Sequence, residues 1–303
     1  MKIGILGAGA MGILFGGLLK KFGHEVTLIV KDNNKKKLLV DKGICLNLDQ
    51  GRFTVYPEIL HIKERSRFEI IIVFTKTNNT IDALNAYKNN IDKDTYLMSL
   101  QNGLGNFEKL LNFADRSKII YGTTMAPADL NGMREVSSFG SHLSQFKSGD
   151  SKNNNFVNQI AKQFQLSSIH SKVNLNVDNV IWDKVAFNTA MNTICALLEI
   201  TPKTIEENKY LKKFALNVAK ETCDIGKAFG IKINETNIAK NIELSCREHG
   251  EHKPSMLQDV LLKKQTEIDS LNGEVVRIGS KLNISTKLNR SLYNLVKAKE
   301  NNY

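Results

Sequence analysis

The feature that most constrains this chain is the glycine-rich segment Gly7-Ala8-Gly9-Ala10-Met11-Gly12. It follows the short apolar run Lys2–Leu6 and opens the helical pattern Met11–Phe22. In such a strand–turn–helix context the first glycine of G-x-G-x-x-G makes the tight turn, the second lets the backbone approach a pyrophosphate, and the third lets the helix pack closely on the strand. The free N–H groups at the start of the helix favour bound phosphate. We therefore predict that residues 7–12 bind a dinucleotide cofactor; the alternative is an ordinary glycine turn.

The first half of the chain alternates short apolar runs with helical patterns, which predicts a mostly parallel sheet with helices on both faces. The run Glu69–Thr75 is apolar from Ile70 to Phe74, as is typical of a strand covered on both faces. The runs Glu135–Phe139 and Leu143–Lys147 flank a Gly-Ser turn and predict an added hairpin. The other predicted elements are strands at Lys2–Leu6, Val26–Val30, Thr95–Leu100 and Lys118–Tyr121, and helices at Met11–Phe22, Thr80–Asn89 and Asn106–Phe113.

Strand-like runs disappear beyond about residue 172, and amphipathic helical patterns follow. The length of 303 residues is enough for two domains. We expect a Rossmann-type α/β domain over residues 1–172 and an all-helical domain over residues 173–303. The predicted helices of the second half are Val177–Leu198, Lys209–Phe229, Glu235–Cys246, Ser255–Lys264, Glu267–Leu282 and Thr286–Lys299.

The formal charge of +11 comes from lysines spread along the chain. No zinc-finger spacing or aromatic stretch accompanies them, so we favour a lysine-rich surface over a nucleic-acid partner. The four cysteines have no C-x-x-C spacing, no signal-peptide layout is apparent, and no apolar stretch approaches the roughly 20 residues of a membrane helix. We expect a cytoplasmic protein with neither a nucleic-acid nor a membrane partner.

One cluster of soft ligands, Cys246-x-x-His249-x-x-His252, suggests a metal site. Structural zinc normally takes four ligands, and no fourth is evident. We interpret this segment as a solvated loop and expect no metal.

The residues after the second predicted strand bear on the choice between NAD and NADP. NAD enzymes usually place a carboxylate there to bind the ribose 2′-hydroxyl. Here Val26–Val30 ends without an acid and is followed by Lys31, which suits a 2′-phosphate. Asp32, one residue further, keeps NAD open, and Lys31 could also be a solvated loop lysine. We expect NADP.

Polar residues also follow two later strands. Lys76 comes after Glu69–Thr75, and Gln101-Asn102-Gly103 comes after Thr95–Leu100. Ligands bind at the carboxyl ends of the strands in open parallel sheets, so Lys76 and Asn102 could contact cofactor or substrate. The alternative is a plain turn, which Asn-Gly favours by itself.

The helical pattern Val177–Leu198 carries Lys184, Asn188 and Asn192, which are four residues apart and form one stripe. Such a stripe can be the wet face of an amphipathic helix. Asparagine is a poor helix former, however, so two asparagines beside one lysine also suit the wall of a cleft. Spacing alone leaves both interpretations open.

Two segments further on look like helix caps. Ser255 with Gln258 has capping-box spacing, and so, loosely, does Thr266 with Asp269. Glu267 would then be an acid in the first helical turn, where the helix dipole favours it. Spacing alone favours caps, although a capping serine can still present its hydroxyl to an anion.

Several of these segments together resemble the ketopantoate reductase family (2-dehydropantoate 2-reductase), from the first residues nearly to the last. The serine and glutamate blocks, twelve residues apart, are the most specific part of the match. The matching segments are Lys2–Gly12, Gln101-Asn102-Gly103, Ile181-Trp182-Asp183-Lys184, Pro254–Asp259, Thr266–Asp269, Asn272-Gly273 and Val276-Arg277.

The resemblance implies a Rossmann domain and a 6-phosphogluconate-dehydrogenase-like helical domain. It implies reduction of a small 2-keto acid, 2-dehydropantoate, to (R)-pantoate by NADPH, in pantothenate and coenzyme A biosynthesis, by a monomer or homodimer. The resemblance implies Lys184 as general acid and Glu267 as a catalytic ligand near the reacting groups. It implies Asn188, Asn192 and Ser255 as substrate ligands, and as NADP contacts Lys31, Lys76, Asn102 and Glu267.

Two positions depart from the family pattern. Thr201-Pro202 stands where the family often supplies a further substrate asparagine, and Lys31 stands where arginine is common. Lysine lacks the bidentate fork of arginine. Two other functions stay open: a related reductase of another 2-keto acid, and a non-catalytic NADP-binding sensor.

Overall fold

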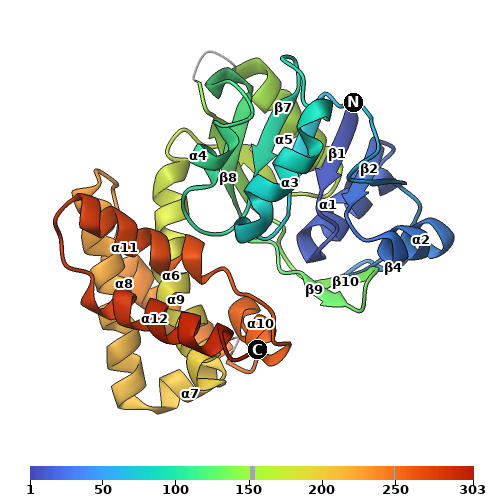
Figure 1. Ribbon diagram of the computed structural model, residues 1–303. Coiled ribbons are helices and arrows are strands. Elements are labelled where there is room, and N and C mark those ends of the chain that lie inside the picture. Colours follow the sequence, from blue (N-terminus) through green and yellow to red (C-terminus); the bar gives the residue numbers. More distant parts are fainter. Residues whose placement is uncertain (151–153, 249) are drawn as a thin grey trace. The chain divides into compact units, whose positions relative to one another are not determined.

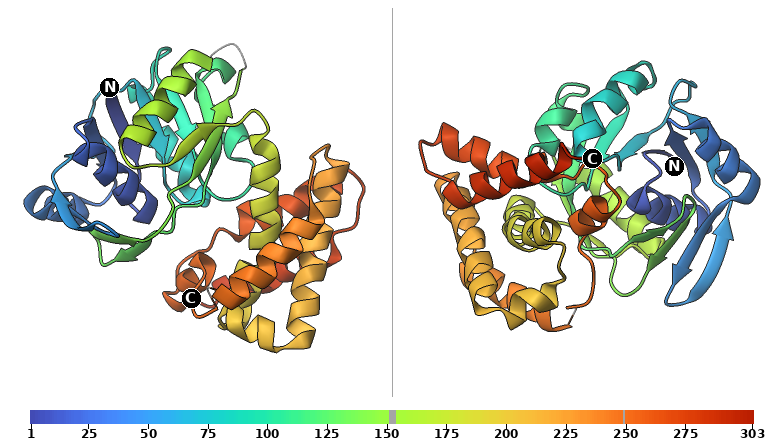
Figure 2. Two further views of the ribbon diagram at one scale, coloured as in Figure 1. Left: turned by 180° about the vertical axis from the view of Figure 1, so that it is seen from behind. Right: turned by 60° about the horizontal axis from the view of Figure 1, so that its bottom comes forward.

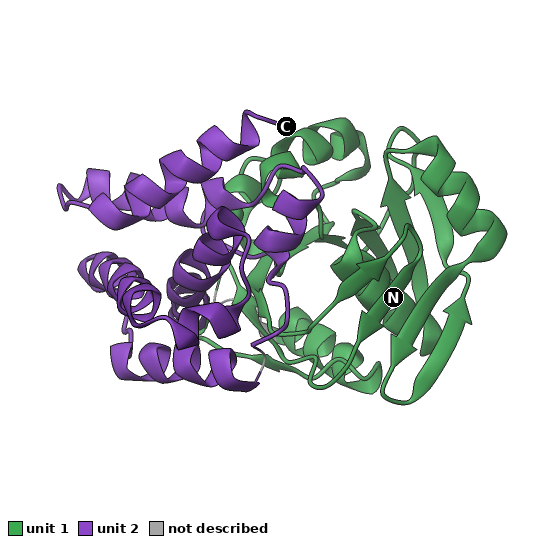
Figure 3. Cartoon of the chain, turned by 90° about the horizontal axis from the view of Figure 1, so that it is seen from below, with its two compact units in different colours: residues 1–101, 106–177 green, residues 102–105, 178–303 purple. Residues whose placement is uncertain are grey.

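The computed structural model describes residues 1–150, 154–248 and 250–303 (Figure 1). The chain folds into two compact units, coloured separately in Figure 3. Unit 1 comprises residues 1–101 and 106–177, and unit 2 comprises residues 102–105 and 178–303. Unit 1 is α/β and unit 2 is helical, so the predicted fold class is confirmed. The division falls a few residues after the expected boundary, because β12 (Ser171–Val173) still pairs within the sheet of unit 1.

An eight-stranded sheet forms the centre of unit 1, in the order β12-β11-β8-β7-β6-β1-β2-β5. Every neighbouring pair is parallel except β8 with β11, which is antiparallel. The remaining strands of this sheet are β1 (Lys2–Leu6), β2 (Glu25–Val30), β5 (Glu58–His61), β6 (Ile70–Val73), β7 (Tyr96–Ser99), β8 (Ile119–Thr124) and β11 (Ser144–Ser148).

Successive residues of the central strands enter two different apolar cores, because side chains alternate between the faces of a strand. Ile3 and Ile5 of β1 pack in the core that also contains side chains of α1 and α5, while Ile71 and Val73 of β6 pack with α3 and α4 on the other face. The sheet is therefore covered on both faces (Figures 1 and 2). These helices are α1 (Ala10–Lys21), α3 (Thr80–Tyr87), α4 (Asn106–Leu110) and α5 (Asn154–Leu166), and α2 (Asn33–Lys42) follows β2.

A second sheet in unit 1 corrects the predicted hairpin. β10 (Glu135–Ser138) pairs in parallel with β3 in the small sheet, whereas β11 pairs with β8 in the large one. Each strand lies second from the edge of a different sheet, paired on both sides, and buries an apolar residue there, Val136 on β10 and Phe146 on β11. The small sheet has the order β4-β3-β10-β9, with β3 at Ile44–Leu48, β4 at Gly51–Val55 and β9 at Asp129–Asn131.

Unit 2 is built around the 22-residue helix α6 (Val177–Leu198), seen nearly end-on in the right-hand view of Figure 2. One apolar cluster contains its residues Ala186, Ala190 and Ile194, and a second contains Trp182 and Val185. The other helices are α7 (Pro202–Glu207), α8 (Lys209–Ala228), α9 (Glu235–Glu248), α10 (Ser255–Leu261), α11 (Asn272–Lys281) and α12 (Lys287–Glu300). None of the described helices is both long and apolar enough to cross a membrane.

The predicted helix Glu267–Leu282 is interrupted. A single 3-10 turn, η5 (Ile268–Ser270), precedes α11, and Leu271 between them has a non-helical backbone (φ −103°, ψ −102°). Contacts of Thr266, Asp269 and Ser270 with other segments hold this turn apart from the helix. Glu267 therefore stands before the turn rather than inside a long helix.

Candidate functional site

The strands of unit 1 end level with one another, which places the predicted cofactor residues at one edge of the sheet. Leu6 of β1 is in register with Ile29 of β2 and with Val73 of β6, and Val73 is in register with Ser99 of β7. The glycine turn, Lys31, Lys76 and Gln101 therefore all follow carboxyl ends of neighbouring strands. This edge is where open parallel sheets bind their ligands.

The glycine turn has the geometry that a bound pyrophosphate requires. A Cβ atom at Gly12 would lie 1.9 Å from the carbonyl oxygen of Gly7, so only glycine allows α1 to pack this closely. Gly7 has φ +105°, a conformation that other residues rarely adopt. A Cβ at Gly9 would meet no atom within 4 Å, and no side chain caps α1 at this residue. The backbone at Gly9 is thus open to a phosphate at the helix N-terminus.

The loop after β2 presents lysines rather than a carboxylate. Asp32 is the N-cap of α2, and its Oδ1 accepts a hydrogen bond from the Lys35 backbone N–H at 2.6 Å. Lys31 is exposed, and its carbonyl oxygen lies 3.0 Å from His61 Nε2. Lys35 Nζ donates to the carbonyl oxygen of Ala8 at 2.6 Å. Lys35 therefore reaches the glycine turn from α2, a contact that the lysine-rich run 35–37 does not reveal by its sequence.

Gln101 and Lys76 mark the ends of β7 and β6. Gln101 Nε2 donates to the Thr75 carbonyl oxygen at 2.6 Å and to Thr80 Oγ1 at 2.9 Å, so this amide ties the two strand ends together. Lys76 follows directly, half-buried, as the N-cap of the 3-10 turn η1 (Thr77–Asn79). Both strand ends are thereby fixed beside the glycine turn.

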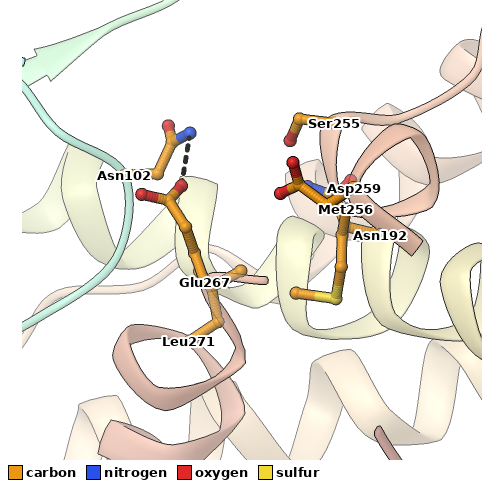
Figure 4. A pocket seen from close by; sticks show the side chains of 7 residues that line it. All are labelled: Asn102, Asn192, Ser255, Met256, Asp259, Glu267 and Leu271. Atoms are coloured by element: carbon orange, nitrogen blue, oxygen red, sulfur yellow. Dashed lines mark hydrogen bonds between the residues drawn. The ribbon is translucent and has the colours of Figure 1, made fainter. Parts of the chain in front are cut away.

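Four of the predicted site residues line one pocket of unit 2 (Figure 4). Asn102 and Glu267 lie together on one side of it, and Asn102 Nδ2 donates to Glu267 Oε2 at 3.5 Å. Ser255 and Asp259 lie on the opposite side. The lining residues are Asn102, Asn192, Ser255, Met256, Asp259, Glu267 and Leu271. Asp259 has no role predicted from the sequence, although it stands in the segment that carries Ser255.

The segment 102–105 belongs to unit 2 because it docks on the turn after Glu267. Leu104 N donates to the Ser270 carbonyl oxygen at 2.8 Å. Gly103 has φ +84°, and a Cβ there would lie 2.4 Å from the same oxygen. This close approach brings Asn102 to Glu267, 165 residues away in the sequence.

Lys184, Asn188 and Asn192 stand on α6, as predicted, but their stripe is not a solvated face. Asn188 is 6% exposed and Asn192 8% exposed, and Lys184 is half-buried. In the described part of the chain neither asparagine amide has a hydrogen-bond partner. Burial lowers the pKa of Lys184 to about 8, and the nearby Glu267 carboxylate opposes this shift.

A buried polar network holds α6 against its neighbours. Thr193 Oγ1 donates to Asn272 Oδ1 of α11 at 2.7 Å, and Thr189 Oγ1 lies 2.9 Å from Thr222 Oγ1 of α8. Thr189 and Thr193 each directly follow one of the two asparagines of the stripe. Because hydrogen bonds in a dry interior must be geometrically satisfied, this network fixes the rotation of α6 and hence the direction of its stripe.

The predicted capping box at Ser255 is wrong, and at Thr266 only the bond from the Ile268 backbone N–H to the threonine hydroxyl forms. The N-cap of α10 is Pro254, Ser255 caps nothing with its side chain, and Gln258 Nε2 instead donates to the Lys253 carbonyl oxygen at 2.9 Å. Asp269 likewise binds Tyr293 rather than a helix start. The proline fixes an extended φ/ψ before α10, which moves Ser255 into the first helical turn and leaves its hydroxyl beside the pocket.

The suggested metal ligand His249 lies outside the described residues. Among those that the structure describes, no group of three or more His, Cys, Asp and Glu side chains could hold a metal ion.

A Rossmann-type unit with a glycine-rich turn, together with a helical unit whose pocket is lined by amides and a glutamate and whose helix α6 carries a lysine, defines an oxidoreductase of the two-domain pyridine-nucleotide type. The chain belongs to the ketopantoate reductase family. The family model described as ketopantoate reductase PanE/ApbA matches residues 3–153, and the model of its C-terminal domain matches residues 176–300.

Similar proteins cover the chain almost completely. The 2-dehydropantoate 2-reductase of Pyrococcus horikoshii is 35% identical over 99% of this chain and 98% of its own. The enzyme of the same name from Lactococcus lactis is 29% identical over the same shares. Among solved structures, a D-mandelate dehydrogenase in ternary complex with NADH and anilino(oxo)acetate matches with a TM-score of 0.95 at 28% identity, over 100% of this chain and 99% of its own.

Proposed function

We propose that this protein reduces 2-dehydropantoate to (R)-pantoate with NADPH, using Lys184 as the general acid. The observation that carries the proposal is the grouping in unit 2. Asn102, Asn192, Ser255 and Glu267 line one pocket, and Lys184 lies on the same helical stripe as Asn192 and within electrostatic range of Glu267. Relatives named for this activity match the chain from end to end.

Lys184 is suited to protonate the product oxygen. When bound, the nicotinamide supplies the hydride to the carbonyl carbon, and negative charge grows on the carbonyl oxygen. The Lys184 ammonium stabilises that charge and then donates its proton to the oxygen. With its pKa lowered to about 8 by burial, Lys184 is still largely protonated at neutral pH but gives up the proton readily.

Neutral donors are suited to the other groups of a hydroxylated 2-keto acid. Asn188, Asn192 and Ser255 can donate hydrogen bonds to a carboxylate or a hydroxyl without adding a charge that would compete with Lys184. Glu267 can only accept when ionised, so it suits a substrate hydroxyl or the Lys184 ammonium. Asn102, which donates to Glu267, keeps that carboxylate in place.

The loop after β2 favours NADPH over NADH. Asp32, the carboxylate nearest to the end of β2, is engaged as the N-cap of α2. Lys31 and Lys35 put two positive charges near the position expected for the 2′-phosphate, and Lys35 already contacts the glycine turn. Opposite charge at close range stabilises a bound phosphate. Lys76, half-buried after β6, is a third cation at the same sheet edge.

Substitution of Lys184 tests this assignment. Lys184→Ala should lower kcat at least about 100-fold for 2-dehydropantoate with NADPH, because it removes the proton donor. Lys213→Ala, at an exposed lysine of α8, should keep the wild-type rate. A folded Lys184→Ala protein with wild-type kcat would refute the role of Lys184.

A second function has its own support. A D-mandelate dehydrogenase that binds NADH matches the whole chain, and Thr201-Pro202 occupies the place of the additional substrate asparagine. Thr201 is the N-cap of α7 and Pro202 is its first residue, and neither residue type has an amide side chain. A reductase of a 2-keto acid that lacks a terminal hydroxyl would need no such donor.

A further inference from the structure

Helix α12, near the end of the chain, turns three polar side chains toward the segment that carries Glu267. Tyr293, Lys297 and Glu300 are spaced by four and three residues, so they share one face of the helix. All three contact Thr266, Asp269 or one another, and all belong to unit 2. This face of α12 therefore binds the turn from Thr266 to Ser270 through hydrogen bonds and an ion pair.

Glu300 makes the central contact of this face. Its Oε1 accepts hydrogen bonds from both the backbone N–H and the hydroxyl of Thr266, each at 2.7 Å. Its Oε2 lies 2.9 Å from Lys297 Nζ, and its side chain is only 3% exposed. Thr266 Oγ1 in turn accepts from the backbone N–H of Ile268 at 3.2 Å. Glu300 thus fixes the residue immediately before Glu267.

The other side of the turn is held as well. Tyr293 Oη donates to Asp269 Oδ1 at 2.9 Å, and Lys297 Nζ lies 3.2 Å from Asp269 Oδ2. Ser270 Oγ donates to the Glu267 carbonyl oxygen at 3.0 Å. Glu267 is therefore fastened through the residues on both sides of it, while its own carboxylate remains directed to Asn102 at the pocket (Figure 4).

This bracing is needed because the turn has little stability of its own. A single 3-10 turn makes few hydrogen bonds of poor geometry. Burying the Glu300 carboxylate is unfavourable unless it is paired and hydrogen-bonded, and here both conditions are met. The buried Glu300 carboxylate therefore stabilises the turn and, with it, the direction of the Glu267 side chain.

We propose that Glu300 is a positioning residue that holds the Glu267 carboxylate at the substrate pocket by fastening Thr266. The inference rests on the proposed role of Glu267 in substrate turnover. It predicts that loss of Glu300 lowers activity through Glu267. If Glu300 had only a structural role, its substitution would lower stability, and its effect on activity would not depend on whether Glu267 is present.

A double-mutant cycle separates these cases. Glu300→Ala should lower kcat/KM for 2-dehydropantoate about 10- to 100-fold, because small displacements of a reacting group have large kinetic effects. In a Glu267→Gln background the same substitution should cost less than about threefold, since the group it positions is already gone. Glu300→Gln keeps the acceptor oxygen for Thr266 and should retain most of the activity. Thr266→Val, which removes one of the two donors to Glu300, replaces Glu300→Ala in the cycle if that variant does not fold. Glu235→Ala, which removes a helix carboxylate bound to Lys227, is the matched control and should stay at the wild-type rate.

Amide hydrogen exchange gives a readout that does not depend on turnover. Peptides covering residues 266–270 and 102–105 should exchange faster in Glu300→Ala than in wild type and the Glu235→Ala control. Unchanged exchange, or equal kinetic losses in the two backgrounds of the cycle, would overturn the positioning role. An inactive wild-type protein, or a fully active Glu267→Gln variant, would instead refute the proposed function while the exchange result still decides whether Glu300 holds the turn.

Discussion

Lys184 concentrates the chemistry of the proposed reaction in one side chain. Its ammonium is disfavoured by burial and favoured by Glu267, and the balance leaves its pKa at about 8. A half-buried lysine of a helix, near a carboxylate, can thus have a pKa that suits a general acid at near-neutral pH.

This balance predicts the pH dependence of turnover. Because the protonated lysine is the active form, kcat/KM for the keto acid should fall as pH rises through about 8. Glu267 raises the pKa of Lys184, so Glu267→Gln should move the falling limb to lower pH in addition to slowing the reaction. Rates measured across the range from about pH 6 to about pH 10 in both proteins test this. A limb that stays fixed, or moves to higher pH, in Glu267→Gln would contradict the coupling.

The neighbouring Asp183 should affect the free energy of unfolding rather than the rate of the reaction. Burial raises its pKa from 3.8 to about 6, and its Oδ1 has no hydrogen-bond partner among the described residues. At about pH 3.5 and below the group is mostly protonated in both folded and unfolded chains, so the penalty for burying its charge is nearly absent. Above about pH 6 it is ionised in both, and the full cost of burying the charge applies.

Asp183→Asn should therefore increase the free energy of unfolding by about 1–3 kcal/mol at pH about 7.5, and leave it unchanged near pH 3.5. Asp224→Asn, at a half-exposed carboxylate of α8, should change it little at either pH. Urea unfolding at the two pH values measures the difference. A destabilised Asp183→Asn protein at the higher pH would show that the carboxylate has a stabilising partner.

At the scale of elements, two glycines of the strand–turn–helix unit at the N-terminus have different tasks, one in folding and the other in binding the cofactor. Gly12 is required for packing, since a Cβ there would collide with the Gly7 carbonyl oxygen, whereas Gly9 faces open space. Gly9→Ala should change the free energy of unfolding by less than about 0.5 kcal/mol, yet weaken NADPH binding at least about tenfold. Gly12→Ala should lose about 1–3 kcal/mol of stability as well. Thermal unfolding and calorimetric titration with NADPH, done on both variants, decide this; undiminished NADPH affinity in Gly9→Ala would mean that the turn does not hold the pyrophosphate.

The elements that could be predicted from the sequence are those with a long, regular pattern. Helix α6 begins and ends at the predicted residues, Val177 and Leu198, because this stretch of 22 residues is largely apolar and contains neither glycine nor proline. The small sheet is not predicted, since β3 and β4 follow each other with no helix between them and so depart from the strand–helix alternation. The hairpin fails for a related reason: adjacent runs suggest pairing with each other, whereas edges elsewhere in the fold offer better partners.

The site divides in the same way. The glycine turn and the α6 stripe are local patterns and could be found by spacing, although the functional roles of their residues remain predictions. The pairing of Asn102 with Glu267 depends on the contact of Leu104 with Ser270. These residues are far apart in the sequence, so no local pattern predicts their contact. The contacts of Lys35 and Glu300 could not be predicted, because lysine and glutamate side chains are usually solvated. Only the fold shows that Lys35 contacts Ala8 and that Glu300 is buried against Thr266.

At the scale of the whole molecule, the proposed machinery is divided between two units. Unit 1 carries the glycine turn, Lys31, Lys35 and Lys76, and unit 2 carries the pocket and α6. The central claim is that this division serves one reaction, the reduction of a hydroxylated 2-keto acid by NADPH.

Steady-state kinetics with two substrates and two cofactors test that claim most directly. We expect kcat/KM to be highest for 2-dehydropantoate with NADPH, and at least about tenfold lower when NADH replaces NADPH or when the keto acid lacks the terminal hydroxyl. Preference for benzoylformate or a branched-chain 2-keto acid with NADH would contradict the account and favour the second function. Binding of NADPH without turnover of any keto acid would contradict both.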